Sequence, residues 1–114
     1  MDLVRKLLFK IEESAGERGT DDVGIDGYSN EMIIYHLELL QDADLIIAYF
    51  TKMANGTRIL NNIQRLTWKG HEFLDAARDE SVWNKAKQKF KEKGESFSLD
   101  LMKEILLNVL HTNI

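Results

Sequence analysis

The sequence contains no cysteine and no proline among its 114 residues. Without cysteine, the chain can form neither disulfides nor thiolate metal sites. Without proline, its helices must end at glycine or at polar capping residues. No stretch approaches the roughly 18 consecutive apolar residues of a membrane-spanning helix, and Met1–Lys6 mixes charged and apolar residues, unlike the apolar core of a signal peptide. We therefore expect a cytoplasmic protein without a membrane partner.

Positive charge is missing from a long internal segment. Between Arg18 and Lys52 there are seven Asp or Glu and no Lys or Arg. Residues 1–80 carry nine basic and fifteen acidic residues, a net charge of −6, whereas residues 81–114 carry six and four, a net charge of +2. A DNA-binding surface needs Lys and Arg to neutralise phosphates. The charge distribution therefore disfavours DNA binding by the segment that lacks basic residues.

Hydrophobic periodicity predicts mainly helical structure in the first part of the chain. Apolar residues at helical spacing predict a helix over 2–15, and an acidic, glycine-rich loop follows over 16–28. Ser29 is a good N-cap for a second helix that runs to about Ala43. With 44% hydrophobic residues, a chain of this length can fill one core. We therefore expect one domain over 1–114.

A hairpin pattern follows the second predicted helix. Residues 45–51 are rich in β-branched and aromatic side chains, and Asn55-Gly56 is a strong hairpin-turn signal. The returning strand is expected over 58–68, with a bulge or bend at Asn61-Asn62. Further helices are expected within 68–93 and 98–111, and the candidate N-caps are Thr67, Asp79, Ser81, Ser96 and Ser98.

This order of elements is typical of a winged helix. We therefore expect a mainly α fold with a small β-hairpin: a winged helix-turn-helix-like core over 1–78 and a C-terminal helical extension over 79–114. The segment 16–28 leaves hardly any room for the extra helix of an ordinary helix-turn-helix. The large apolar residues expected in the core together are Leu7, Leu37, Trp68 and Phe73.

Several blocks of sequence carry a family resemblance. Tyr35–Ile46 is similar to the recognition helix and first wing strand of small bacterial winged-helix regulators, and Leu66–Gly70 is similar to the end of their wing. The whole chain, over about residues 1–110, resembles domain-of-unknown-function family 2513. The residues that carry this likeness are Tyr35–Leu37, Leu66–Trp68, Gly70-His71, Phe73–Asp75 and Trp83–Lys85. The resemblance implies a winged-helix-like fold and a bacterial, phage or prophage origin, and it implies no activity.

The sequence offers little for catalysis or metal binding. His36 lies among apolar residues, where a packed or hydrogen-bonded side chain is expected. His71 and Asp75 are spaced i, i+4, but two residues do not make a metal site and the pattern is not H-E-x-x-H. We therefore expect no enzymatic activity, no metal and no cofactor.

Two functions fit the predicted fold. The first is nucleic-acid binding, with double-stranded DNA as the partner, in a regulator of phage or mobile-element origin. Lys and Arg would contact phosphates, and polar residues at the start of the second helix would contact bases. The predicted contact residues are Ser29, Asn30, Lys52, Arg58, Lys85, Lys87, Lys89 and Lys91. The alternative for the lysine cluster is a solvated helix face.

The second function is protein interaction without DNA binding. It is favoured by the acidic span over 19–51 and by the last helix, which is apolar over more than half its circumference. We expect this helix to form a homodimer, and the predicted contacts are Leu101, Met102, Ile105, Leu106 and Val109. The rival is that an apolar stripe covers the helix within one chain, formed by Val82, Trp83, Ala86 and Phe90. The two functions rank nearly even, with nucleic acid slightly ahead.

Overall fold

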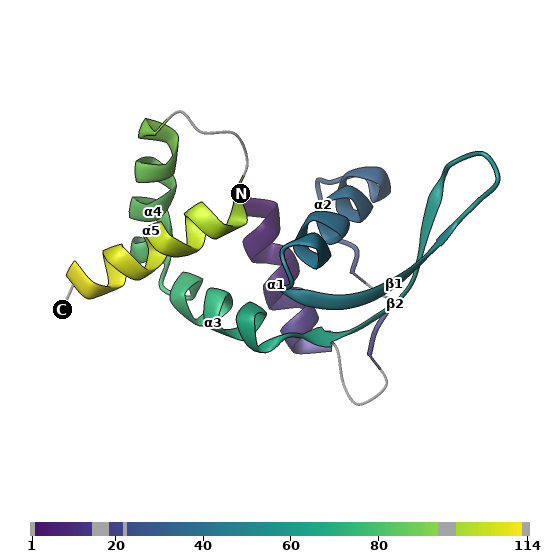
Figure 1. Cartoon of the computed structure of the whole chain (residues 1–114), viewed down its shortest axis with the longest axis horizontal. Helices are drawn as coiled ribbons and strands as arrows, with labels where there is room; N and C mark the ends of the chain where they lie inside the picture. The colour runs from purple at the N-terminus through teal and green to yellow at the C-terminus, as the bar shows by residue number, and fades with distance from the viewer. Residues whose placement is uncertain (1, 15–18, 22, 94–97, 113–114) are drawn as a thin grey trace. The chain divides into compact units, whose positions relative to one another are not determined.

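The computed structural model describes residues 2–14, 19–21, 23–93 and 98–112. In chain order the elements are α1 (Asp2–Ser14), α2 (Asn30–Asp42), β1 (Ile46–Lys52), β2 (Arg58–Leu66), α3 (Trp68–Ala77), α4 (Glu80–Glu92) and α5 (Leu99–Thr112). The described chain is thus mainly α with a small β-hairpin, as the sequence predicts (Figure 1). Element ends differ from the predicted ones by one or two residues, the usual uncertainty at helix ends. The winged-helix classification stays a prediction.

The chain divides into two units, Met1–His71 and Glu72–Ile114. The division falls within α3, whereas the sequence pattern places a boundary after residue 78. The expectation of a single domain over 1–114 stays a prediction. Within the predicted loop over 16–28, residues 16–18 and 22 lie outside the described residues, as does the candidate cap Ser96.

The core of the first unit lies between two helices and one face of the hairpin. Helices α1 and α2 contact each other, and each contacts the hairpin. The Oε1 atom of Gln41 accepts a hydrogen bond from the Ala48 backbone N–H at 2.6 Å, which ties the end of α2 to β1. The buried apolar residues are Leu3, Val4, Leu7, Leu8, Ile11, Ile33, Leu37, Leu40, Ile46, Ala48, Ile63 and Leu66. This packing fixes the hairpin's inner face and leaves its outer face to the solvent.

The hairpin is antiparallel and carries two irregularities. Pairing runs from Ile46 opposite Leu66 to Lys52 opposite Arg58, and β2 has one extra residue at each register shift. One extra residue is Asn61, which confirms the bulge predicted there. Gly56 has a φ of +89° in the turn, the left-handed conformation that glycine adopts without strain. All residues over 51–59 are exposed, so the tip of the hairpin projects beyond α2 (Figure 1).

In the second unit, α4 packs against α5. Phe73 of α3 meets Trp83 of α4 edge to face, with ring centroids 6.5 Å apart. The predicted caps are in place: Asp79 Oδ1 accepts from the Val82 N–H at 3.0 Å, and Ser98 Oγ accepts from the Leu101 N–H at 3.2 Å. Local capping signals therefore set where both helices begin.

Trp68 is a correction to the predicted core. Its side chain is 80% exposed, whereas Leu7, Leu37 and Phe73 are fully buried. The exposure of Trp68 follows from its angular position on α3, because successive residues of an α-helix are about 100° apart around its axis. Trp68 is the first residue of α3 and therefore lies on the opposite side of this helix from Phe73 and Ala77, which face the core.

The predicted dimer contacts on α5 are also largely covered. Four of them, Met102, Ile105, Leu106 and Val109, are buried, and Leu101 is half-buried. Val82, Trp83 and Ala86 of α4 are buried in the same unit, as the rival interpretation expects. In this conformation the four buried side chains cannot contact a second chain. The homodimer itself stays a prediction.

Candidate nucleic-acid interface

The structure separates the predicted nucleic-acid contacts of the first unit into two roles. Asn30 and Arg58 line the same groove, between the start of α2 and the hairpin. Lys52 is exposed and lies opposite Arg58 in the strand pair. Ser29 instead caps α2, because its Oγ accepts a hydrogen bond from the Met32 N–H at 3.2 Å. Three of these four residues therefore gather near the hairpin, and Ser29 has a structural role.

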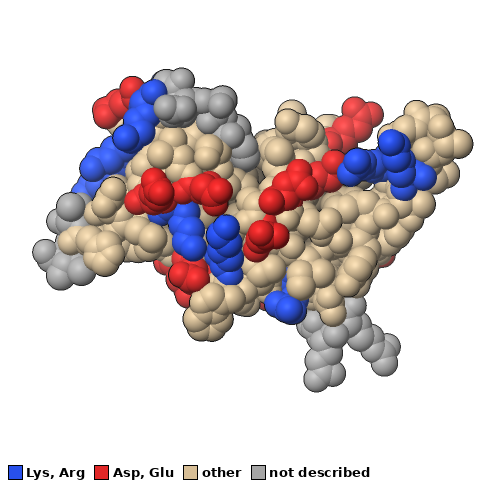
Figure 2. Space-filling model, viewed as in Figure 1, with Lys and Arg blue, Asp and Glu red and all other residues tan. Residues whose placement is uncertain are grey.

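The solvent face of α2 is acidic and aromatic. Glu31, Tyr35 and Asp42 are exposed on it. Arg58 Nη1 lies 3.1 Å from Glu38 Oε2, so the guanidinium beside α2 is ion-paired with a carboxylate of that helix. Figure 2 shows acidic side chains over α2 next to the basic groups of the hairpin. Helix α2 cannot neutralise phosphates, so it is a poor match for a DNA-reading helix.

Basic residues gather instead in the hairpin and the start of α3. The segment over 45–71 contains four Lys or Arg and no Asp or Glu, and its basic residues are Lys52, Arg58, Arg65 and Lys69. The first three are exposed and Lys69 is half-buried. Arg65 and Lys69 were not among the predicted contacts. The absence of acids over these 27 residues was the signal that could have identified them.

The outer face of the hairpin carries aromatic and amide groups beside Arg65, which lies opposite Ile47. Because strand residues alternate between faces, the burial of Ile46 and Ala48 places Tyr49 on the outer face, where it is 54% exposed. Its hydroxyl donates to Gln64 Oε1 at 3.4 Å. Nearby, the Asn61 Nδ2 donates to Thr51 Oγ1 at 2.6 Å. The outer face therefore offers an aromatic ring together with hydrogen-bonding groups.

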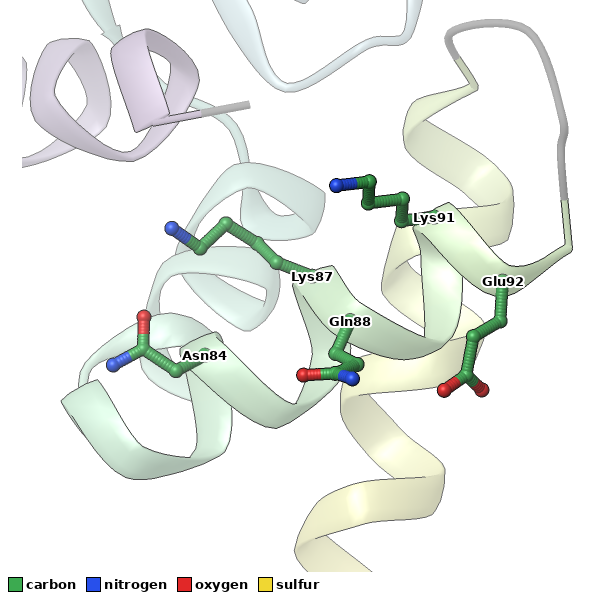
Figure 3. A pocket seen from close by; sticks show the side chains of 5 residues that line it. All are labelled: Asn84, Lys87, Gln88, Lys91 and Glu92. Atoms are coloured by element: carbon green, nitrogen blue, oxygen red, sulfur yellow. The ribbon is translucent and has the colours of Figure 1, made fainter.

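The four predicted lysines of α4 do not form one surface. Residues two apart lie about 200° apart around a helix, so Lys87 and Lys91 occupy one flank and Lys85 and Lys89 another. Lys87 and Lys91 line a shallow hollow on the surface, together with Asn84, Gln88 and Glu92. Figure 3 shows Lys87 and Lys91 extending to the same side of α4, with Glu92 pointing elsewhere. The four lysines therefore form two pairs on different flanks of α4, and the Lys87–Lys91 pair lines the hollow.

The histidines considered for chemistry have ordinary surroundings. His36 Nδ1 donates to the Met32 carbonyl at 2.9 Å, which confirms a hydrogen-bonded histidine. Asp75 pairs with Arg78 at 2.9 Å. Within the described ranges, no three residues among His, Cys, Asp and Glu gather as metal ligands would. The helices of the same ranges are too short or too polar to cross a bilayer.

Comparison with known proteins places the chain in a family. Residues 1–96 match the family model described as "Hypothetical protein (DUF2513)". The chain belongs to the DUF2513 family. A Haemophilus influenzae (strain Rd) relative named "Uncharacterized protein" is 37% identical over 111 residues, which cover 96% of this chain and 92% of the relative. No solved structure matches.

Proposed function

We propose that this DUF2513 protein binds nucleic acid through the hairpin and the start of α3, and not through α2. The observation that carries the proposal is the division of charge within the first unit. The segment over 45–71 holds four Lys or Arg and no Asp or Glu, whereas the segment over 19–44 holds seven Asp or Glu and no Lys or Arg. Phosphates would be attracted to the first segment and repelled by the second. A regulatory role and a phage origin stay predictions.

The number of available cations limits how strongly the surface can bind. Arg58 is ion-paired with Glu38, whereas Lys52 and Arg65 are exposed. Two neutralised phosphates correspond to a slope of about −1.4 in log affinity against log salt for single strands, and about −1.8 for duplex DNA. Binding should therefore be modest at physiological salt and clear at low salt.

Fluorescence anisotropy with labelled single-stranded and duplex DNA, over a salt series, tests this proposal. The double variant Lys52→Gln, Arg65→Gln removes both of these exposed cations. We expect it to reduce the salt slope by about 1.4 for single strands, because each phosphate contact contributes about 0.7. The absence of any binding at low ionic strength would reject nucleic-acid binding by this protein.

A matched control separates local contacts from net charge. The double variant Arg78→Gln, Lys93→Gln also removes two exposed cations, but it does so in the second unit. Its salt slope should remain close to that of the native chain. An equal loss in both variants would mean that the protein responds only to total charge, and the hairpin would then have no special role.

A second candidate function is protein binding at the groove between α2 and the hairpin. The groove is lined by Asn30, Glu31, Ile34, Tyr35, Glu38, Gly56, Thr57 and Arg58. The groove contains two glutamates and one arginine, and that arginine is already ion-paired. The charge of the groove therefore favours a partner segment with Lys or Arg, and Ile34 and Tyr35 favour an apolar side chain next to that basic residue. Charge reversal at Glu31 would weaken such a partner and would strengthen nucleic-acid binding, so the variant Glu31→Lys distinguishes the two functions.

A further inference from the structure

We infer that the ligand of this surface is a single-stranded nucleic acid whose bases stack on Tyr49 and Trp68. The inference rests on the proposed function and specifies its ligand. Both rings are exposed, Tyr49 at 54% and Trp68 at 80%. Both belong to the segment over 45–71, which has no acid. Proteins that bind single strands combine such aromatic platforms with a basic surface.

Exposure of the aromatic rings is not sufficient for the inference, because the charges near each ring also decide whether a nucleic acid can bind there. Tyr35 is as exposed as Tyr49, at 59%, but it lies on the acidic face of α2. Phosphates that follow a stacked base would meet Glu31 and Glu38 beside Tyr35. Near Tyr49 they would meet Arg65, which lies opposite Ile47 in the strand pair, and Lys69 follows Trp68 directly in the chain. Charge therefore selects two of the three aromatic rings that are exposed among the described residues.

The strand register places Tyr49 and Arg65 on the same face of the sheet, and Trp68 follows the end of β2 in the chain. Tyr49 lies opposite Asn62, and Arg65 lies opposite Ile47, nearer the end of the ladder. The Thr67 N–H donates to the Leu45 carbonyl at 3.0 Å, so the ladder ends there and Trp68 follows at once. From Tyr49 to Ile46, at the end of the ladder, the strand covers about 10 Å.

Arg65 can bind a phosphate of a strand whose base stacks on Tyr49, because the two residues lie on the same face of the sheet. Its Nη1 donates to the Leu66 carbonyl at 3.1 Å, which orients the guanidinium. An arginine has five N–H donors, so others remain for phosphate oxygens. Gln64, Asn61 and Thr51 offer hydrogen bonds to base edges from the same outer face.

A duplex would not use this surface in the same way. In a duplex the bases stack on each other, so their faces are not available to Tyr49 or Trp68, whereas a single strand can turn its bases outward. The affinity for a single strand should therefore depend on the two rings, and any affinity for a duplex should depend on the cations alone.

Intrinsic fluorescence gives a direct test, because the chain has two tryptophans and Trp83 is buried. The probe is an oligo-dT of about a dozen nucleotides, long enough for a typical single-strand site. Stacking should quench the emission of the exposed Trp68. In the variant Trp68→Phe the quenching should vanish, while anisotropy should show that most of the affinity remains.

Alanine variants measure the contribution of each ring. Trp68→Ala and Tyr49→Ala should each weaken oligo-dT binding about tenfold, within the range of base–aromatic stacking. Tyr35→Ala is the matched control and should leave the affinity unchanged. Because all three side chains are exposed, the melting temperatures should stay close to that of the native chain, so that a loss of binding is not a loss of folding.

Three outcomes would overturn the inference. If duplex and single-stranded DNA bind equally and neither Trp68→Ala nor Tyr49→Ala has an effect, nucleic-acid binding is retained as the proposed function and base stacking on the two rings is rejected. If poly-glutamate binds as tightly as oligo-dT, the surface recognises acidic polymers, including acidic proteins. If no nucleic acid binds at low salt, the inference and the proposed function fall together.

Discussion

Gly70 packs directly against the carbonyl of Leu45, with no room for a Cβ between them. Leu45 begins the chain's path into β1, and Gly70 lies in the first turn of α3. The same carbonyl accepts the hydrogen bond from the Thr67 N–H. The glycine therefore allows the end of the hairpin and the start of α3 to approach at backbone distance.

The variant Gly70→Ala should destabilise the protein. The added methyl would collide with backbone atoms, which cannot move aside as a flexible side chain can, so we expect a loss of about 1–3 kcal/mol in the free energy of unfolding. Gly24→Ala is the control, because a Cβ there meets nothing within 4 Å. Urea denaturation of both variants measures the difference. Equal stabilities would show that the approach at Gly70 can relax freely.

Phe73 and Trp68 should respond to truncation in opposite ways. Phe73 is fully buried against Trp83, so Phe73→Ala should cost about 3–5 kcal/mol. Trp68 is exposed, so Trp68→Ala should change the free energy of unfolding by no more than about 0.5 kcal/mol. Thermal melts followed by circular dichroism compare them. A large loss in Trp68→Ala would place this ring in a packed site.

Local signals in the sequence predicted much of this fold. The helix starts at Ser29 and Thr67 were predicted from capping chemistry, as was the turn at Asn55-Gly56, whereas for α4 and α5 the sequence offered two candidate caps each and the structure uses Asp79 and Ser98. These features depend on residues within a few positions of each other. The hydrophobic faces of α1 and α2 were equally clear, because periodicity is a property of the segment itself.

The features that the sequence did not predict depend on residues far apart in the chain. Glu38 and Arg58 pair across twenty positions, and no local pattern indicates that this arginine is neutralised. The exposure of Trp68 depends on where α3 begins relative to its buried face. The basic side of the candidate site was visible in the sequence only as a run without acids, and the strand register was needed to place Arg65 beside Tyr49.

Ser29 should matter for stability and not for binding. Its hydroxyl caps α2, so Ser29→Ala should cost about 1 kcal/mol, and Ser29→Thr should retain most of the cap. Ser81→Ala is the control, because Ser81 lies within α4, where alanine is the better helix former. Denaturation curves and oligo-dT titrations together separate the roles. A binding defect in Ser29→Ala at unchanged stability would restore Ser29 as a contact residue.

The lysines of α4 can be tested as two pairs. Lys87 and Lys91 line one hollow, so phosphate contacts there would make Lys87→Gln, Lys91→Gln lower the salt slope by about 1.4 for single strands. Because the proposed surface lies on the hairpin and the start of α3, we expect this slope to stay unchanged. Lys85→Gln, Lys89→Gln has the same change in charge on the other flank and should have little effect. Anisotropy over a salt series measures both. Identical slopes would show that α4 is only a solvated helix face.

The last prediction concerns association through α5. Leu106 is fully buried within the chain, whereas the adjacent Leu107 is 38% exposed. Leu106→Ala should therefore cost about 2–5 kcal/mol in stability, as for a buried leucine, and leave the molar mass in solution unchanged. A homodimer built on α5 can use only the solvent-exposed side of this helix, which carries Leu107, so Leu107→Asp should dissociate the dimer.

Light scattering at rising protein concentration, below the melting temperature of each variant, measures the molar mass and therefore the oligomeric state. A native dimer that Leu107→Asp converts to a monomer would support association through the open side of α5. A dimer that dissociates in Leu106→Ala, while its helical content is intact, would show instead that the α4–α5 packing opens on association. The buried side of α5 would then be an interface between chains.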